Sequence, residues 1–358
     1  MFRNLHKGFH RPGTWVLGLA LLCACGKTFT VEEPRELTLR PAATVSTKAD
    51  PELNGASLGT DNSYVILASA SAAEQPEYLT GQWFTYHAAT AKWKATTVDD
   101  IADSGTYDYS HPVFWPMGGV MVDFLALALK PEAYGVLTTS PGSITFNDAG
   151  NGGSAGGVTI AEWNTYENQY DVMYAVNNGQ SVGNSSAGTV PLNFQHALAV
   201  VSFTAKNTSG DDGIFTLKSL TMNGLYYKGT LTLDNTTTGF SPSWAVSDDD
   251  GHQGDKDIPM TSVPFVVPGP SASGQAIKCT EHLLVIPQVS RSVTLTYRVS
   301  NSPADLTLVL PLPRQVWRAG HRYTYNLGLN ATEIKAEVLD VSVSAWDGSH
   351  VDESITVD

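Results

Sequence analysis

The sequence predicts an all-β chain, and three observations support that prediction. Turn-forming residues are plentiful, with 32 glycines and 19 prolines among 358 residues. Charged residues make up only 16% of the chain, which is sparse for a helical protein. Short apolar runs end in turn clusters, and several alternate between apolar and polar residues, which is the period of a half-buried strand.

The clearest strands lie in the second half of the chain. In residues 291–300, Val293, Leu295, Tyr297 and Val299 point to one face, and polar residues alternate with them. This period of two, with β-branched and aromatic residues, is typical of strands that are half buried. The strands expected here are 196–206, 225–233, 291–300, 306–310 and 321–330, of which the first is expected to be buried on both faces.

The first half gives weaker signals. Its run 120–129 fits either a strand or a buried helix, because periodicity does not separate the two in a short apolar run. The turn-rich stretches 147–157 and 177–190 are the strongest breaks. Two β-sandwich domains are therefore expected, over 49–190 and 191–358. The strands expected in the first domain are 64–70, 83–88, 120–129, 143–146, 158–163 and 171–176.

The first 24 residues predict a secretory signal peptide. Three basic residues precede a short apolar run, 15–22, which is well below the roughly 20 residues that span a bilayer. The run ends in Leu22-Cys23-Ala24-Cys25, which resembles the bacterial lipobox. We expect cleavage between Ala24 and Cys25, and attachment of acyl chains such as palmitate to Cys25. Two or three chains would anchor the protein stably in a membrane.

Cysteine usage and charge exclude several classes of protein. Cys23 would leave with the signal and Cys25 would be blocked by lipid, so Cys279 has no partner for an internal disulfide. We interpret it as a packed apolar residue. Removing residues 1–24 moves the net charge from −14 to −17. Such an acidic chain is not expected to bind nucleic acid, which needs basic patches.

The motifs of enzymes and metal sites are weak. Ser154 lies in a literal GxSxG, but a nucleophile elbow needs a helix after the serine, and a strand pattern follows here. The acidic run 248–257 lacks the spacing of a calcium loop, so a solvated turn is expected. No metal site or cofactor is predicted. The histidines are scattered, at His87, His111, His196, His282 and His321, with no HExxH motif.

Tryptophans in the first half raise an alternative. In an exposed patch they would stack on sugar rings, whereas inside a β-sandwich they would form its core. The core interpretation is favoured, and a glycan-binding surface lipoprotein stays as the second hypothesis. The residues concerned are Trp83, Trp93, Trp115 and Trp163.

Several short segments, in their order along the chain, resemble the fimbrillin family of the Bacteroidetes, whose members are lipoprotein precursors of cell-surface fimbriae. The resemblance covers most of the chain after the signal. The segments that carry it are 111–116 (HPVFWP), 194–198 (FQHAL), 284–288 (LVIPQ), 317–320 (WRAG), 323–327 (YTYNL) and 341–346 (VSVSAW).

The resemblance implies two transthyretin-like β-sandwich domains in tandem and no enzymatic activity. It also implies assembly by strand exchange. A trypsin-like protease removes the lipidated N-terminal strand, here within residues 25–48, and the groove left open accepts a strand from the next subunit. Partners would be other fimbrial subunits, the outer membrane through Cys25, and a ligand on a host or bacterial surface. The implied role is adhesion by a stalk, tip or anchor subunit.

Both ends of the chain carry residues for this scheme. The candidate cleavage sites are Arg35, Arg40 and Lys48; proline follows Arg40 and resists most such proteases, so Arg35 and Lys48 are favoured. The candidate donor strand is the C-terminal tail. Ile355 and Val357 lie two residues apart and would face the same way in a strand. The apolar residues of this tail are Val351, Ile355 and Val357.

Overall fold

The computed structural model divides the chain into two compact units, Met1–Glu33 and Pro34–Asp358. Among the predicted sites, Cys25, Lys48, Ser154, Val351 and Val357 lie outside the described residues, as does Cys279. The described residues are 33–43, 58, 64–72, 75–97, 107–133, 144–146, 157–185, 187–209, 214–233, 242–246, 256–260, 265–269, 277–278, 282–300, 302–330, 333, 335–346 and 353–356.

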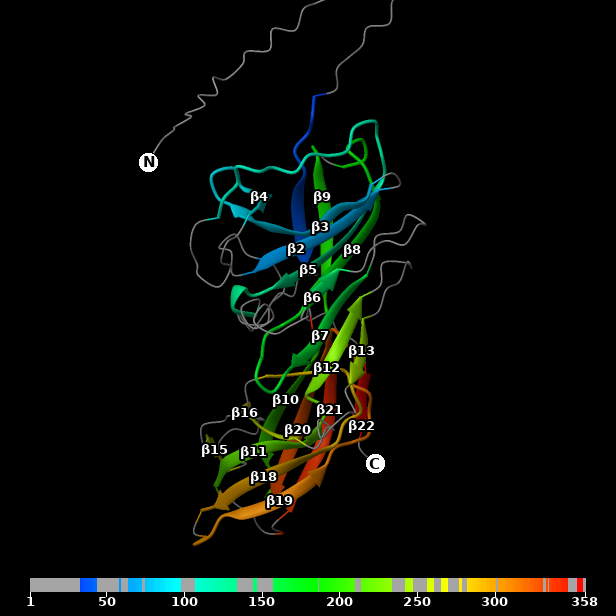
Figure 1. The fold of residues 1–358 in the computed structure, drawn as a ribbon. Coiled ribbons are helices and arrows are strands. Elements are labelled where there is room, and N and C mark those ends of the chain that lie inside the picture. Colours follow the sequence, from blue (N-terminus) through cyan, green and yellow to red (C-terminus); the bar gives the residue numbers. More distant parts are fainter. Residues whose placement is uncertain are drawn as a thin grey trace, which may run out of the picture. The chain divides into compact units, whose positions relative to one another are not determined.

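The described part of the chain is all-β, as predicted. It contains 22 strands and one short helical turn at residues 131–133 (Figure 1). The run 120–129, which the sequence left open between helix and strand, contains a strand. No helix among the described residues is long and apolar enough to cross a membrane.

Seven strands of the N-terminal part form one closed sheet. Where the sequence predicted a sandwich, β1 bridges two strands and closes the sheet on itself. The strands in order around the sheet are β1 (Thr38–Ala43), β4 (Lys92–Thr96), β3 (Gln75–His87), β2 (Val65–Ala72), β5 (Val122–Leu129), β8 (Met173–Gln180) and β9 (Thr189–His196).

Alternation places different residues of β2 and β5 in two cores. Ile66 and Phe124 point into the closed sheet, whereas Leu67 and Leu125 belong to a second core outside it. Both faces of these strands are therefore buried, which explains why the sequence of β5 is apolar almost throughout.

A four-stranded sheet supplies much of that second core. Its fully buried Trp163 and Ile160 belong to the same cluster as the outer residues of β2 and β5. Two of its strands precede residue 190 and two follow it. They are, in order across the sheet, β13 (Ser243–Val246), β12 (Lys228–Leu233), β7 (Val158–Asn164) and β6 (Ile144–Phe146).

Two further sheets share the largest core and form a β-sandwich. Buried aromatic residues such as Phe203, Tyr297 and Tyr325 fill it. The first sheet has the order β16 (Ile277–Lys278), β10 (Ala199–Asn207), β20 (His321–Asn330), β21 (Lys335–Ala345) and β22 (Glu353–Thr356), with β17 (Leu283–Val285) also on β10. The second has the order β14 (Lys256–Met260), β11 (Phe215–Leu225), β18 (Ser292–Val299) and β19 (Leu306–Pro311), with β15 (Phe265–Val267) also on β11.

Candidate functional site

The N-terminal strand occupies a slot between two strands that would otherwise be edges. β1 pairs in parallel with β9 over six positions, from Thr38↔Thr189 to Ala43↔Phe194. On its other side it pairs antiparallel with β4 at Thr38↔Lys94 and Leu39↔Trp93. We refer to this position between β4 and β9 as the β1 slot. Because β1 alone joins β4 to β9, it decides whether the sheet is closed.

The residues just before β1 are held by a loop rather than by a strand. The amide of Leu37 donates to the carbonyl of Val113 at 2.8 Å, and the amide of Trp115 donates to the carbonyl of Arg35 at 2.9 Å. These bonds hold residues 35–37, which precede the two positions of β1 that pair with β4. The sequence had marked 111–116 as a motif, but nothing local in it indicated that the loop would clasp the N-terminal segment.

Apolar burial holds β1 in the slot. Leu37 is fully buried and Leu39 is 2% exposed, and both belong to the core of the closed sheet. Burying each leucine stabilises the closed sheet by about 1.5–3 kcal/mol. Thr38 points to the other face, where its hydroxyl lies 2.9 Å from that of Thr189. The backbone bonds to β4, β9 and the loop add about 1 kcal/mol each.

A turn before β9 approaches the N-terminal segment closely. Gly188 has a φ of +81°, and a Cβ on it would lie 2.9 Å from Cγ and Cδ of Arg35 and 3.0 Å from the carbonyl oxygen of Glu36. Its own carbonyl accepts hydrogen bonds from the Trp115 indole at 2.8 Å and the Thr38 amide at 3.3 Å. Only glycine meets both the conformational and the steric demand.

One ion pair fixes the start of the segment. Nζ of Lys94 lies 2.8 Å from Oε1 of Glu36, and the two side chains are 16% and 32% exposed. This partly buried pair joins the residues before β1 to β4. Glu36 directly follows Arg35. The predicted cleavage site after Arg35 therefore lies at the edge of the segment that these contacts hold.

The predicted cleavage residues occupy different places relative to β1. Arg35 is exposed and precedes the strand, whereas Arg40 is exposed within it, immediately before Pro41. Lys48 comes after the strand ends at Ala43 and lies outside the described residues. Cleavage at each of the three residues would therefore affect the β1 slot differently. The sequence alone favoured Arg35 and Lys48 equally as cleavage sites.

The predicted donor tail forms an edge strand within the chain. β22 pairs antiparallel with β21 over four positions, from Asp340↔Thr356 to Val343↔Glu353. It lies at the end of its sheet, so β21 is its only strand partner among the described residues. Ile355 lies in β22 opposite Val341.

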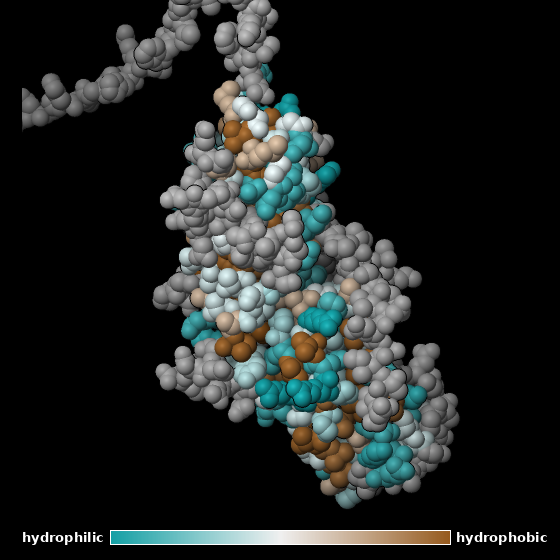
Figure 2. Space-filling model, turned by 90° about the vertical axis from the view of Figure 1, so that its right-hand side faces the viewer, coloured by the Kyte–Doolittle hydropathy of each residue, from teal (hydrophilic) through white to brown (hydrophobic). Residues whose placement is uncertain are grey.

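Exposed apolar side chains gather beside the slot. The loop that clasps residues 35–37 and its continuation carry three exposed large hydrophobic residues: Phe114 at 44%, Met117 at 62% and Met121 at 57%. Figure 2 shows apolar residues on the surface at the end of the unit where the chain enters β1. We call these three residues the apolar rim of the slot.

The tryptophans do not form an exposed sugar-stacking patch. Trp93, Trp115 and Trp163 are 5%, 4% and 1% exposed, and Trp83 is partly buried against the second core. The core interpretation of these residues is therefore confirmed. Of the acidic run 248–257, only Lys256 and Asp257 are described, and Asp257 accepts a hydrogen bond from the Gly224 amide.

The histidines are not brought together as a set, but one of them forms a buried pair. Nδ1 of His196 lies 2.7 Å from Oδ2 of Asp171, and its ring stacks on Trp346 at a centroid distance of 4.0 Å. Burial raises the pKa of Tyr64, and the nearby charge of Asp171 raises it further. Among the described residues, no group of three or more potential ligand side chains is arranged to hold a metal ion.

Comparison with protein families gives one match. The model of a family described as fimbrillin-like matches residues 59–346. This range contains nearly all of the strands described above, and it leaves β1 and the C-terminal tail outside. Comparison with curated proteins gives no match.

Comparison with solved structures gives matches that include proteins from Bacteroides and Porphyromonas. A fimbrial protein from Bacteroides vulgatus has a TM-score of 0.55 at 17% identity, over 86% of this chain and 99% of that one. A putative cell adhesion protein from Bacteroides uniformis has a TM-score of 0.49 at 16% identity, over 87% and 99%. The tip fimbrial protein Mfa3 from Porphyromonas gingivalis has a TM-score of 0.38 at 11% identity, over 87% and 100%. At these identities the first similarity supports the fold, and the two lower scores support no further argument.

Proposed function

The chain belongs to the fimbrillin-like family, and from this premise we propose that it is a fimbrial subunit that acts in adhesion and assembles by strand exchange at the β1 slot. The observation that supports the proposal is the position of β1 between β4 and β9. Removing it would leave two unpaired strand edges and a trough lined by the neighbours of Leu37 and Leu39. Exposed edges of this kind recruit strands from other chains.

The position of β1 selects among the cleavage sites. A cut after Arg35 would leave β1 attached to the body of the protein, and a cut after Arg40 would divide the strand at a bond that precedes proline. A cut after Lys48 would detach the whole strand, because β1 ends at Ala43. We therefore propose Lys48 as the maturation site.

The proposed donor is the C-terminal tail of a neighbouring subunit. β22 is an edge strand with four paired residues, so its release would break the ladder to a single strand, β21. In the β1 slot it would gain strand partners on both sides. The apolar rim lies where the incoming subunit would arrive, and we propose that Phe114, Met117 and Met121 contact it. Head-to-tail contacts of this kind generate a filament.

Export and anchoring form part of the same proposal. Residues 1–24 direct secretion, and Cys25 carries the lipid that holds the precursor at the outer membrane. A subunit that keeps residues 25–48 would stay tethered and serve as an anchor, and one cut after Lys48 would enter the fimbria. The division into two transthyretin-like domains at residue 190 stays a prediction within this scheme.

We also propose that the protein has no enzymatic activity. The His196–Asp171 pair lies beside a cavity, but no serine, threonine or cysteine is among the described residues that line it. A histidine and a carboxylate without a nucleophile cannot carry out acyl transfer by the triad mechanism.

The test compares chains with and without β1. Purified residues 49–358 should form ladders that resist SDS, whereas residues 34–358, which retain β1, should stay monomeric. A synthetic peptide of residues 36–46 should block the ladders and raise the melting temperature of residues 49–358, because it refills the slot. If both chains form the same ladders, or neither does, the slot is not the site of exchange.

Paired variants test the donor strand. In a strand, Ile355→Asp with Val357→Asp places two charges on the face that would enter the trough, where each unpaired charge costs several kcal/mol. Ser354→Asp with Thr356→Asp places the same charges on the opposite face. The first pair should abolish ladders and the second should preserve them. Equal behaviour of the two double variants would exclude this tail as donor.

A further inference from the structure

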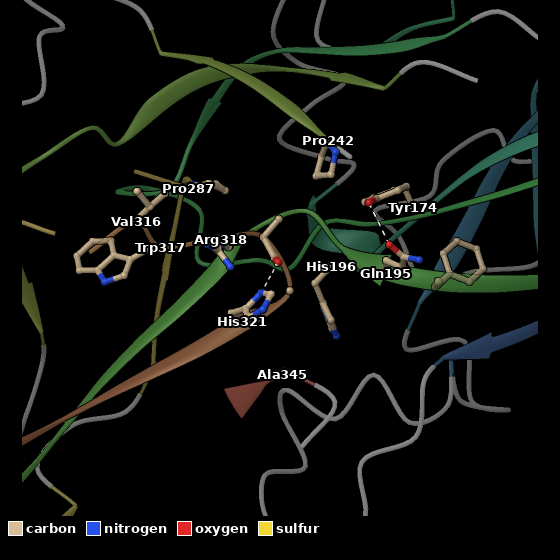
Figure 3. A pocket seen from close by; sticks show the side chains of 13 residues that line it. Tyr174, Gln195, His196, Pro242, Pro287, Val316, Trp317, Arg318, His321 and Ala345 are labelled. Carbon is tan, nitrogen blue, oxygen red and sulfur yellow. Dashed lines mark hydrogen bonds between the residues drawn. The ribbon is translucent and has the colours of Figure 1, made fainter. Parts of the chain in front are cut away.

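A cavity of about 550 Å³ lies where several separate segments of the chain meet (Figure 3). Three of these segments carry most of its polar groups: the end of β9 with Gln195 and His196, the stretch from Trp317 to His321 that leads into β20, and the end of β21 at Ala345. Its volume falls within the roughly 300–1,000 Å³ of small-molecule sites. The described lining of this cavity contains no residue of β1 or β22.

The cavity is basic in a protein that is strongly acidic overall. Residues 306–332 contain no aspartate or glutamate, although the whole chain has a net charge of −14. The same stretch carries Arg314, Arg318, His321 and Arg322. No acidic residue is among the described residues that line the cavity. Such a local excess of positive charge attracts anions.

Hydrogen bonds orient the two imidazoles of the cavity. Nδ1 of His321 lies 2.9 Å from the carbonyl oxygen of Ala319, which only accepts, so Nδ1 carries a proton. Nδ1 of His196 likewise faces the carboxylate of Asp171. The remaining nitrogen of each ring, Nε2, is left for other partners.

Two further side chains offer hydrogen-bond donors. Burial raises the pKa of Tyr174 to about 12, so its hydroxyl stays protonated and donates to Oε1 of Gln195 at 3.2 Å. This bond leaves the amide NH₂ of Gln195 for another acceptor. The guanidinium of Arg318 is exposed and forms no ion pair with any described residue; only its backbone amide is engaged, with the Tyr323 hydroxyl at 2.9 Å.

We propose that this cavity binds a small ligand through a carboxylate group. Arg318 presents a planar fork of N–H donors, which matches the two oxygens of a carboxylate. Gln195 and His321 would fix the remaining polar groups of the ligand. Sugar acids and free organic acids both carry this group, and the experiment distinguishes them.

The experiment titrates the purified protein with sodium glucuronate, sodium succinate and glucose, using calorimetry and the NMR signals of the histidine rings. At least one of the two acids should bind saturably, with a Kd of roughly 1 mM or below, and glucose should not bind. Binding of glucuronate alone identifies a sugar acid, and binding of succinate identifies an organic acid. Either result supports the proposal.

Two arginine variants supply the control. Arg318→Gln should weaken binding at least about tenfold, equal to 1.4 kcal/mol. Arg314→Gln removes another exposed positive charge, four residues away, that is not among the described residues lining the cavity, and it should leave the Kd unchanged. Both should keep the melting temperature. The proposal is overturned if neither acid binds, if glucose binds equally well, or if both variants weaken binding to the same extent.

Discussion

Substituting Gly188 tests whether the turn before β9 holds the N-terminal segment. A Cβ at this position would lie 2.9 Å from the side chain of Arg35 and 3.0 Å from the carbonyl oxygen of Glu36. The arginine side chain can move, but the carbonyl belongs to the clasped backbone. Gly188→Ala should therefore displace residues 35–37 from their position against the turn.

Two terms set the expected loss of stability. A φ of +81° costs a residue with a side chain about 1–2 kcal/mol, and forcing apart a packed contact costs about 1–3 kcal/mol more. Gly179 provides the matched control, because its φ is +67° but nothing lies within 4 Å of its added Cβ. Gly179→Ala should lower the stability only by the cost of the positive φ. Comparison of the two variants therefore separates backbone strain from the steric contact.

The measurement combines unfolding by denaturant with hydrogen exchange of the amides in residues 36–40. Gly188→Ala should lower the free energy of unfolding by about 2–5 kcal/mol and speed exchange in β1. Gly179→Ala should lower it by about 1–2 kcal/mol and leave exchange in β1 unchanged. Equal exchange of the β1 amides in the two variants would refute the claim that this turn clasps the segment.

Other predictions concern the core and the lipid anchor. The buried hydroxyl of Tyr297 has no hydrogen-bond partner in the described part of the chain, so Tyr297→Phe should maintain or raise the melting temperature. Tyr325→Phe should lower it, because the Tyr325 hydroxyl accepts from the Trp317 indole at 2.9 Å. Burial raises the pKa of Tyr325 to about 12, so the stability that its neutral form provides should be intact below about pH 10 and fall towards pH 12 in alkaline unfolding curves. Cys25→Ala should abolish labelling by a fatty-acid probe, whereas Cys23→Ala should not.

The all-β class was predictable because alternation along one strand is a local signal. In 321–330, Tyr323, Tyr325, Leu327 and Leu329 were expected on one face, and all four are buried. The closure of the N-terminal sheet was not predictable in this way. It depends on parallel pairing between residues 38–43 and 189–194, which are about 150 residues apart, and no local pattern records which strand lies beside which.

The candidate sites were predictable as residues but not as arrangements. Side-chain chemistry alone identified the candidate cleavage sites Arg35, Arg40 and Lys48. Only the fold showed that Arg35 precedes β1, that Arg40 lies within it and that Lys48 follows it. The role of Gly188 rests on a close approach between distant segments. Similarly, the segments around His196, Arg318 and Ala345 were each noted in the sequence, but their convergence on one cavity depends on tertiary packing.

The two terminal strands differ in a way that would order the steps of assembly. β1 lies between two strands, and Leu39 within it and Leu37 just before it are buried, so spontaneous loss of this segment would cost its ladder bonds and about 3–6 kcal/mol of apolar burial. β22 has one neighbouring strand and four paired residues. A precursor should therefore keep its slot closed while its tail opens and closes. Proteolysis would be the controlling step. Only removal of β1 would open the β1 slot, and the open slot could then accept β22 of a neighbouring subunit. Uncleaved subunits should thus stay monomeric even at high concentration, which is the property that the proposed precursor would need before it reaches the surface.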